Sequence, residues 1–203
     1  MSAITLRNRQ RVRRINAPLL RRIVTAVLEE VAGDGEHELC IHLVAAPEMA
    51  RINQQYLQHD GSTDVITFDY AEGYEKPHDD LSTSVTLSPR RTSGEKAVER
   101  GISTSTSSPR SSPPSFVRRR GSRLHGEIFI CLNDAIAQAR QFRIRWQSEL
   151  TRYVVHGILH LFGHDDLKPT ARRKMKAEEN RVLRSLTARF PLSQLARKSK
   201  MRS

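Results

Sequence analysis

The residues best able to carry chemistry lie in one short stretch, VVHGILHLFGHDD, at residues 154–166. His156 and His160 are four positions apart, so on a helix both imidazoles share one face and can reach one ion. Gly163 follows, and glycine permits the left-handed backbone that ends a helix. The chain can therefore turn back after Gly163 and present a third ligand to the same ion.

This third ligand can come from the cluster directly after the glycine, His164, Asp165 and Asp166. A continued helix would place His164 about 12 Å beyond His156, so the turn is needed. Three protein ligands with one open position are the arrangement of a catalytic zinc site. A simple helix end with polar residues would not explain two imidazoles within an otherwise apolar helix.

Gly157 bears on which reaction the site could catalyse. In zinc peptidases of the H-E-x-x-H type, the Glu after the first His is the general base. Here that position is Gly157, so a peptidase is disfavoured. The open zinc position can still hold a water molecule of lowered pKa.

The elements around the motif follow from hydrophobic periodicity. The two histidines lie on an apolar helix expected over 146–162. Asn16, followed by Pro18, and Asn133 are expected to begin two further helices. Helices are expected at about 17–31, 47–57, 133–142 and 170–186, buried strands at 39–44, 65–68 and 127–132, and a short basic edge strand at 11–16. Helices with a few strands around one core indicate an α/β or α+β fold.

The composition changes from about residue 72 to residue 123, where Ser, Thr, Pro and Arg replace large apolar residues. Such a segment buries too little surface to offset its ordering entropy, which predicts a disordered insertion. The basic stretch 188–203 is expected to be a loose tail. With 203 residues, the chain is expected to form a single domain.

The net charge of +12, from 34 Lys and Arg against 22 Asp and Glu, favours a polyanionic partner. Nucleic acid is the first candidate and an anionic membrane surface the second. No apolar run spans a membrane and the basic N-terminus has no apolar signal region, so a cytoplasmic location is expected. Cys40 and Cys131 lie in apolar runs, which indicates buried thiols in a reducing compartment rather than a disulfide or metal ligands.

The histidine motif resembles the signature H-G-x-L-H-L-x-G-[YH]-D-[HD] of the YbeY family of metal-dependent endoribonucleases. The resemblance covers about residues 8–70 and 124–187 and skips the insertion. Three further blocks carry it in order: Asn8-Arg9-Gln10, then the pair Ile52–Tyr56 and Thr63–Phe68 (L-N-x-x-Y and T-D-V-L-S-F in the family), then Gly126–Ile130 (G-D-I-x-I).

The resemblance implies an α+β fold with a small mixed sheet flanked by helices and a metal site at the end of a central helix. It implies one Zn²⁺ per chain, with His156 and His160 as metal-binding and catalytic residues. It further implies cleavage of single-stranded RNA, with ribosomal RNA and the ribosome (30S, 70S) as partners. The implied roles are maturation of the 16S rRNA 3′ end and late-stage quality control of the 70S ribosome.

Two positions depart from the family pattern. The third family histidine, ten residues after the first, is Asp166 here; Asp is an acceptable zinc ligand, so Asp166 is the expected third ligand and His164 the alternative. The family arginine that follows the tyrosine is replaced by Leu57, which cannot contact a phosphate through charge. In addition, Asp64 is a candidate to hydrogen-bond a ligand imidazole.

Two competing functions remain open at this point. One is a non-catalytic, zinc-containing ribosome-assembly factor that binds RNA, which Leu57 favours. The other is a metal-dependent hydrolase of peptides or small molecules, against which Gly157 and the positive charge both count.

Overall fold

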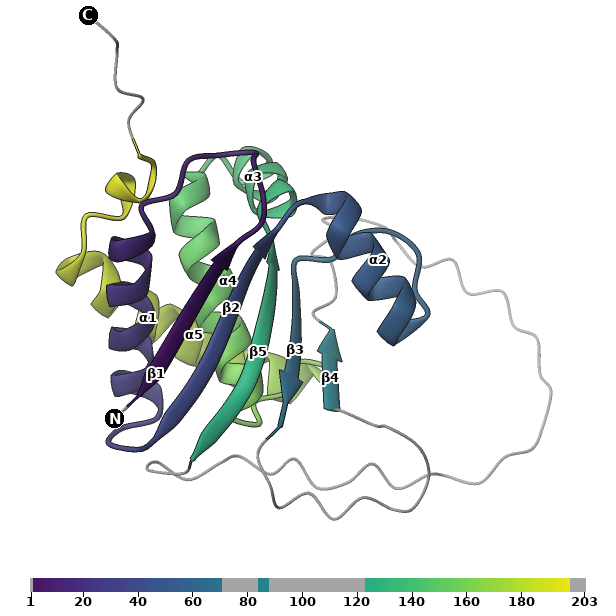
Figure 1. Cartoon of the computed structure of the whole chain (residues 1–203). Helices are drawn as coiled ribbons and strands as arrows, with labels where there is room; N and C mark the ends of the chain where they lie inside the picture. Colours follow the sequence, from purple (N-terminus) through teal and green to yellow (C-terminus); the bar gives the residue numbers. More distant parts are fainter. Residues whose placement is uncertain (1, 71–83, 88–122, 198–203) are drawn as a thin grey trace, which may run out of the picture.

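A computed structural model describes residues 2–70, 84–87 and 123–197 of the chain (Figure 1). The elements in chain order are β1 (Ala3–Asn8), α1 (Ala17–Val31), β2 (His37–Val44), α2 (Ala46–Leu57), β3 (Val65–Asp69), β4 (Ser84–Leu87), β5 (Leu124–Cys131), α3 (Leu132–Gln141), α4 (Trp146–Leu161), α5 (Pro169–Arg189) and the short 3-10 helix η1 (Leu192–Leu195). None of the described helices is long and apolar enough to cross a bilayer.

The strands form one mixed sheet in the order β1-β2-β5-β3-β4. β1, β2 and β5 are parallel, whereas β3 is antiparallel to both β5 and β4. The expectation of an α+β fold with a small mixed sheet flanked by helices is confirmed.

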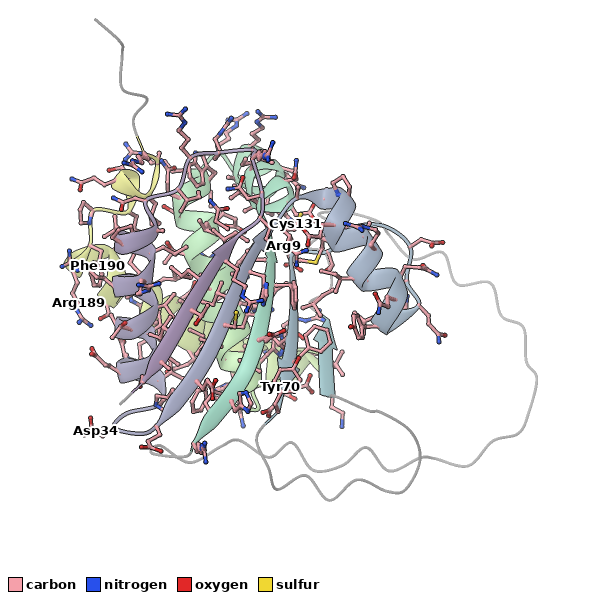
Figure 2. The ribbon with its side chains drawn as sticks, viewed as in Figure 1. Arg9, Asp34, Tyr70, Cys131, Arg189 and Phe190 are labelled. Carbon is pink, nitrogen blue, oxygen red and sulfur yellow. The ribbon has the colours of Figure 1, made fainter. Side chains whose placement is uncertain are left out.

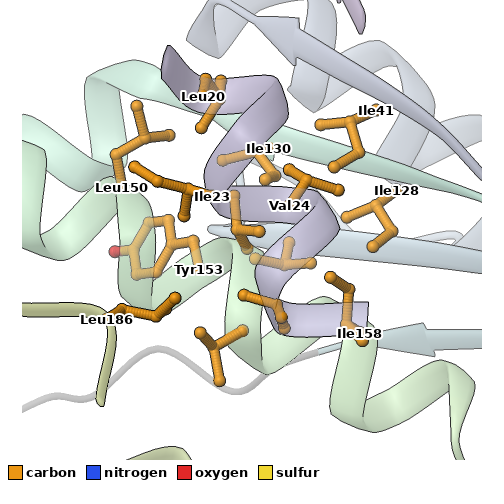
Figure 3. Packing of buried hydrophobic residues seen from close by; sticks show 14 of the residues in the cluster. Leu20, Ile23, Val24, Ile41, Ile128, Ile130, Leu150, Tyr153, Ile158 and Leu186 are labelled. Atoms are coloured by element: carbon orange, nitrogen blue, oxygen red, sulfur yellow. The ribbon is translucent and has the colours of Figure 1, made fainter. Parts of the chain in front are cut away.

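The main core lies between one face of this sheet and the helices α1, α4 and α5; in Figure 1, α4 and α5 lie behind the sheet and α1 stands beside β1. Strand residues alternate between the two faces of a sheet, and Leu39, Ile41, Ile128 and Ile130 all point to this side. Figure 3 shows residues of α1 such as Ile23 and Val24 in one cluster with Ile41, Ile128 and Ile130 of the strands and with Leu150 and Ile158 of α4.

The opposite face of the sheet is covered only in part. A second, smaller apolar cluster lies there beneath α2 and contains Met49, Ile66, Phe68 and Cys131. No described helix lies over the remainder of β2 and β5 on this side, which faces the viewer in Figures 1 and 2. We call this part of the sheet the open face.

Of the two asparagines expected to begin helices, one caps its helix and the other does not. Asn16 caps α1 as predicted, because its side chain accepts a hydrogen bond from Leu19 N at 3.2 Å. The prediction for Asn133 is wrong: α3 begins one residue earlier, at Leu132, and its N-cap is Cys131. The Asn133 side chain instead accepts a hydrogen bond from Ala46 N at 3.0 Å, which ties α3 to the start of α2.

The expected edge strand at 11–16 is also wrong, since the edge strand is β1, at residues 3–8. Buried Gln10 turns the chain here, because its amide nitrogen donates to Arg13 O at 2.9 Å and its oxygen accepts from Arg13 N at 3.0 Å. Only Ile15 forms a bridge, and its partner is Ala196.

Two expected flexible segments contain regular structure. Within 72–123 the structure describes β4, which pairs with β3; the rest of this range lies outside the described residues. The expectation of a loose tail from residue 188 is wrong as far as residue 197. α5 continues to Arg189, and Phe190, Leu192 and Leu195 are buried in the main core.

Candidate metal centre

Helix α4 lies directly against the sheet because glycines allow a close approach. A Cβ atom on Gly157 would lie 2.8 Å from Ile128 Cγ2 and 3.2 Å from Val65 Cγ1. One turn later, Leu161 packs against Gly126 of β5, where a Cβ would lie 3.2 Å from its side chain. Gly157 therefore points into the sheet, while His156, one residue earlier, points elsewhere.

The end of α4 turns back as the sequence predicts. Gly163 has a φ of +83°, the left-handed conformation that glycine adopts readily. Its N–H donates to His160 O at 2.8 Å, and His164 N donates to Leu159 O at 3.0 Å. This turn brings the following residues alongside the last turn of the helix.

Three side chains meet at this end of α4. The Nε2 atoms of His156 and His160 are 3.0 Å apart, and the two rings are nearly perpendicular. Asp166 Oδ2 lies 4.0 Å from His156 Nε2, and Asp166 Oδ1 lies 3.9 Å from His160 Nε2. All three side chains are largely buried, with His160 almost fully enclosed.

Main-chain geometry fixes the orientation of His160. Its Nδ1 lies 2.9 Å from the carbonyl oxygen of His164, which can only accept a hydrogen bond. Nδ1 is therefore the donor, and Nε2 presents its lone pair toward His156 and Asp166. A carbonyl that orients an imidazole in this way is a common feature of metal-binding histidines.

The donor set fits a metal ion. Burial lowers the pKa of His160, and Asp166 opposes this shift. Burial likewise raises the pKa of Asp166, and His160 opposes that shift. Asp166 Oδ1 is buried and accepts no hydrogen bond within the described part of the chain. A cation among the three groups would offset these desolvation costs, and the 3.0 Å between the imidazole nitrogens is close to the roughly 3.3 Å edge of a zinc tetrahedron.

The alternative third ligand, His164, contributes its main chain rather than its ring. At this end of α4, the ligand atoms that lie within 4.8 Å of one another belong to His156, His160 and Asp166. The His164 ring is half-buried, burial lowers its pKa, and Glu178 of α5 opposes the shift. The geometry thus favours Asp166, although its role as a ligand stays a prediction.

Arg172, near the start of α5, is a neighbour of the site that the sequence did not reveal. Its Nε donates to the main-chain oxygen of Asp166 at 2.9 Å, and its charge lowers the pKa of the Asp166 carboxyl. The arginine thereby holds the loop that presents Asp166. Within the charged helix 170–186, its type and spacing do not distinguish it from Arg173.

Leu57 has a structural role in this chain. It packs against the apolar cluster beneath α2, whereas the preceding Tyr56 is half exposed and contacts the ring of Phe68 edge-on. The position of the family arginine is thus filled by an apolar contact.

Asp64 directly precedes β3, and its Oδ1 accepts hydrogen bonds from Thr63 Oγ1 and Val65 N. Burial raises its pKa to about 7. Its suggested contact with a ligand imidazole stays a prediction.

The fold and the site together define an α+β protein with a His-His-carboxylate candidate metal centre at the end of a helix that packs on a mixed sheet. The family model described as "Endoribonuclease YbeY" matches residues 5–187. The chain therefore belongs to the YbeY endoribonuclease family.

Individual relatives carry the same name. A Bacteroides fragilis protein named "Endoribonuclease YbeY" is 29% identical over 160 residues, which cover 79% of this chain and 78% of the relative. A Chlorobium luteolum protein of the same name is 29% identical over 176 residues, with 86% and 91% coverage. A solution structure from Thermotoga maritima is 20% identical, covers 98% of this chain and 99% of its own, and has a TM-score of 0.47.

Proposed function

We propose that this protein is a zinc-dependent endoribonuclease that cleaves single-stranded RNA. The observation that carries the proposal is the convergence of His156, His160 and Asp166, with His160 Nε2 directed at the other two groups. Family membership supports the nuclease class. The net charge of +12 supports a polyanionic substrate.

The residues of the chain have distinct roles in this proposal. His156, His160 and Asp166 would hold one Zn²⁺. The ion supplies Lewis-acid activation of water and of the phosphodiester when bound. The His164 carbonyl orients His160, and Arg172 holds the Asp166 loop. Gly157 faces the sheet, so that position offers no carboxylate for peptide hydrolysis.

The proposed biological role is maturation of the 16S rRNA 3′ end and late-stage quality control of the 70S ribosome. The partners would be ribosomal RNA and the ribosome, in its 30S and 70S forms, and the location would be the cytoplasm. The basic charge and the family support this role.

The test is cleavage of a single-stranded ribosomal RNA fragment by the full-length, zinc-loaded protein. The same fragment annealed to its complement tests strand specificity. His160→Ala and chelated wild-type protein are the inactive controls, and His59→Ala, which removes an exposed histidine, is the matched control. We expect wild type and His59→Ala to cut only the single strand. Equal cleavage by His160→Ala would contradict the proposal.

Leu57 supports a second candidate, a zinc-containing assembly factor that binds ribosomal RNA without cutting it. Its apolar packing leaves no charge at the position of the family arginine. Zinc-loaded protein that binds the fragment and leaves it intact would favour this candidate. The variant Leu57→Arg then asks whether the missing charge alone prevents cleavage.

A further inference from the structure

A second group of metal-binding side chains lies on the open face of the sheet, away from α4. Cys40 and His42 are two residues apart on β2, so both point to this face. Glu127 on β5 is the register partner of Cys40. His42 Nε2 lies 3.2 Å from Cys40 Sγ and 3.5 Å from Glu127 Oε1, and the ligand atoms of all three groups lie within 4.8 Å of one another.

The His42 ring is the central element of this group. Its side chain is only 4% exposed, and it stacks on Phe129 with ring centroids 4.2 Å apart and planes 9° apart. This stacking directs Nε2 into the space between Cys40 and Glu127. The other nitrogen, Nδ1, is buried and has no hydrogen-bond partner within the described residues. Burial of a neutral imidazole in this way costs desolvation free energy, which the contacts of Nε2 with Cys40 and Glu127 do not fully offset.

The surroundings define what the group can bind. Burial raises the pKa of the Cys40 thiol and lowers the pKa of His42. A metal ion that binds here would have to displace the proton of the thiol. Arg7 and Arg9 are close enough to influence His42, and their charge reduces the affinity for a cation. Tyr70 Oη lies 3.5 Å from Glu127 Oε2, at the edge of the group.

We propose that Cys40, His42 and Glu127 form a second metal site for one divalent cation of borderline softness, Zn²⁺ above all. A thiolate, an imidazole and a carboxylate are three ligand types that zinc accepts together, whereas Mg²⁺ and Ca²⁺ prefer oxygen alone. Three ligands leave a fourth position open to solvent on the open face. The site joins β2 to β5 and lies on the opposite side of the sheet from the main core.

The absorption spectrum of bound Co²⁺ can distinguish the two sites, because it depends on the ligand types. The site at the end of α4 offers only nitrogen and oxygen ligands, whereas the second site adds a sulfur ligand. Metal-free, full-length protein, kept reduced by a phosphine, is titrated with Co²⁺ and followed by absorption. A sulfur-to-cobalt charge-transfer band in the near ultraviolet reports the second site alone. A parallel Zn²⁺ titration by calorimetry counts the sites.

We expect wild type to show the thiolate band and about two Zn²⁺ per chain. Cys40→Ser should lose the band and one Zn²⁺, whereas His160→Ala should keep the band and lose the other Zn²⁺. Glu127→Gln should weaken the band-forming site at least ten-fold. The matched control is Glu38→Gln, which removes the charge of an exposed carboxylate on β2. It should change neither the band nor the number of Zn²⁺ bound.

Three results would overturn the proposal. The first is the absence of a thiolate band at saturating Co²⁺. The second is a band that persists in Cys40→Ser, because the ligand would then be Cys131. The third is a single Zn²⁺ that His160→Ala removes entirely. In each case the group would be an ordinary hydrogen-bonded cluster. None of these results depends on RNA cleavage.

Discussion

At the scale of single residues, the candidate centre separates two neighbours in sequence that could each be a ligand. Asp166 directs its carboxylate at the two imidazoles, whereas His164 uses its carbonyl to orient His160. Replacement of His164 by alanine removes the ring but leaves the main-chain carbonyl in place. The two residues should therefore respond differently to replacement by alanine.

Asp166→Ala should weaken zinc binding at this centre at least 10- to 100-fold, since it removes one of three ligands. His164→Ala, the matched control, should leave the affinity within a few-fold, because the hydrogen bond to His160 Nδ1 remains. Competition with a chromophoric chelator measures both, in a Cys40→Ser background that leaves one candidate site. If His164→Ala proves the more damaging, the ligand assignment is reversed.

At the scale of elements, the two glycines beneath α4 set how closely this helix approaches the sheet. A methyl group on Gly157 would overlap Ile128 Cγ2, which lies on a strand and cannot easily move. The helix would shift outward, and the histidines at its end would shift with it. Helix position is thus coupled to the geometry of the site.

Gly157→Ala should lower the free energy of unfolding by up to about 2 kcal/mol, because overpacking costs about 1–3 kcal/mol and helix propensity returns only about 1 kcal/mol. Urea unfolding measures this change. The control is the same substitution in an Ile128→Ala background, where the overlapping methyl is absent and the cost should largely vanish. Equal costs in both backgrounds would show that contact with Ile128 is not the cause.

The segment after α5 also stabilises the domain. Phe190, Leu192 and Leu195 are buried in the main core, and Asn16 N donates to Leu195 O at 2.9 Å. Each buried side chain contributes about 1.5–3 kcal/mol, so ending the chain at Arg189 should cost at least about 4 kcal/mol and lower Tm clearly. A chain that ends at Arg197 is the control and should melt as wild type does. Unchanged melting of the shorter chain would mean that this packing contributes little.

The elements also show which features the sequence could predict. His156, His160 and Gly163 are close in the chain, so helix periodicity and the conformation of glycine were enough to place them together. Cys40 and Glu127 are 87 residues apart, and only the pairing of β2 with β5 brings them together. Asn133 has the residue type of a helix cap, but its side chain binds Ala46 N of another element instead. Local pattern predicts local geometry, and tertiary contacts decide the rest.

At the scale of the whole molecule, the two candidate metal groups lie on different sides of one sheet. The group at the end of α4 is largely buried, whereas the group on the open face leaves Glu127 one-third exposed. The net positive charge opposes any cation in either place. The affinity for a metal ion must therefore come from the ligands themselves, so removal of one ligand should weaken metal binding strongly.

The same net charge makes a quantitative prediction for RNA binding. Each phosphate contact to a single strand contributes about −0.7 to the slope of log affinity against log salt. With roughly six contacts, affinity should fall about 300-fold between about 50 and 200 mM salt. Fluorescence anisotropy with His160→Ala protein measures binding without cleavage, and its slope should match that of chelated wild type.

The C-terminal residues beyond Arg197 refine this prediction. Residues 198–203 contain Lys198, Lys200 and Arg202. If all three contact phosphates, a chain that ends at Arg197 should lose up to about 2 units of the slope. Because the same truncation should leave Tm unchanged, a lost slope would reflect lost contacts and not a damaged fold. An unchanged slope would place the phosphate contacts elsewhere, among the many Lys and Arg residues that precede Lys198.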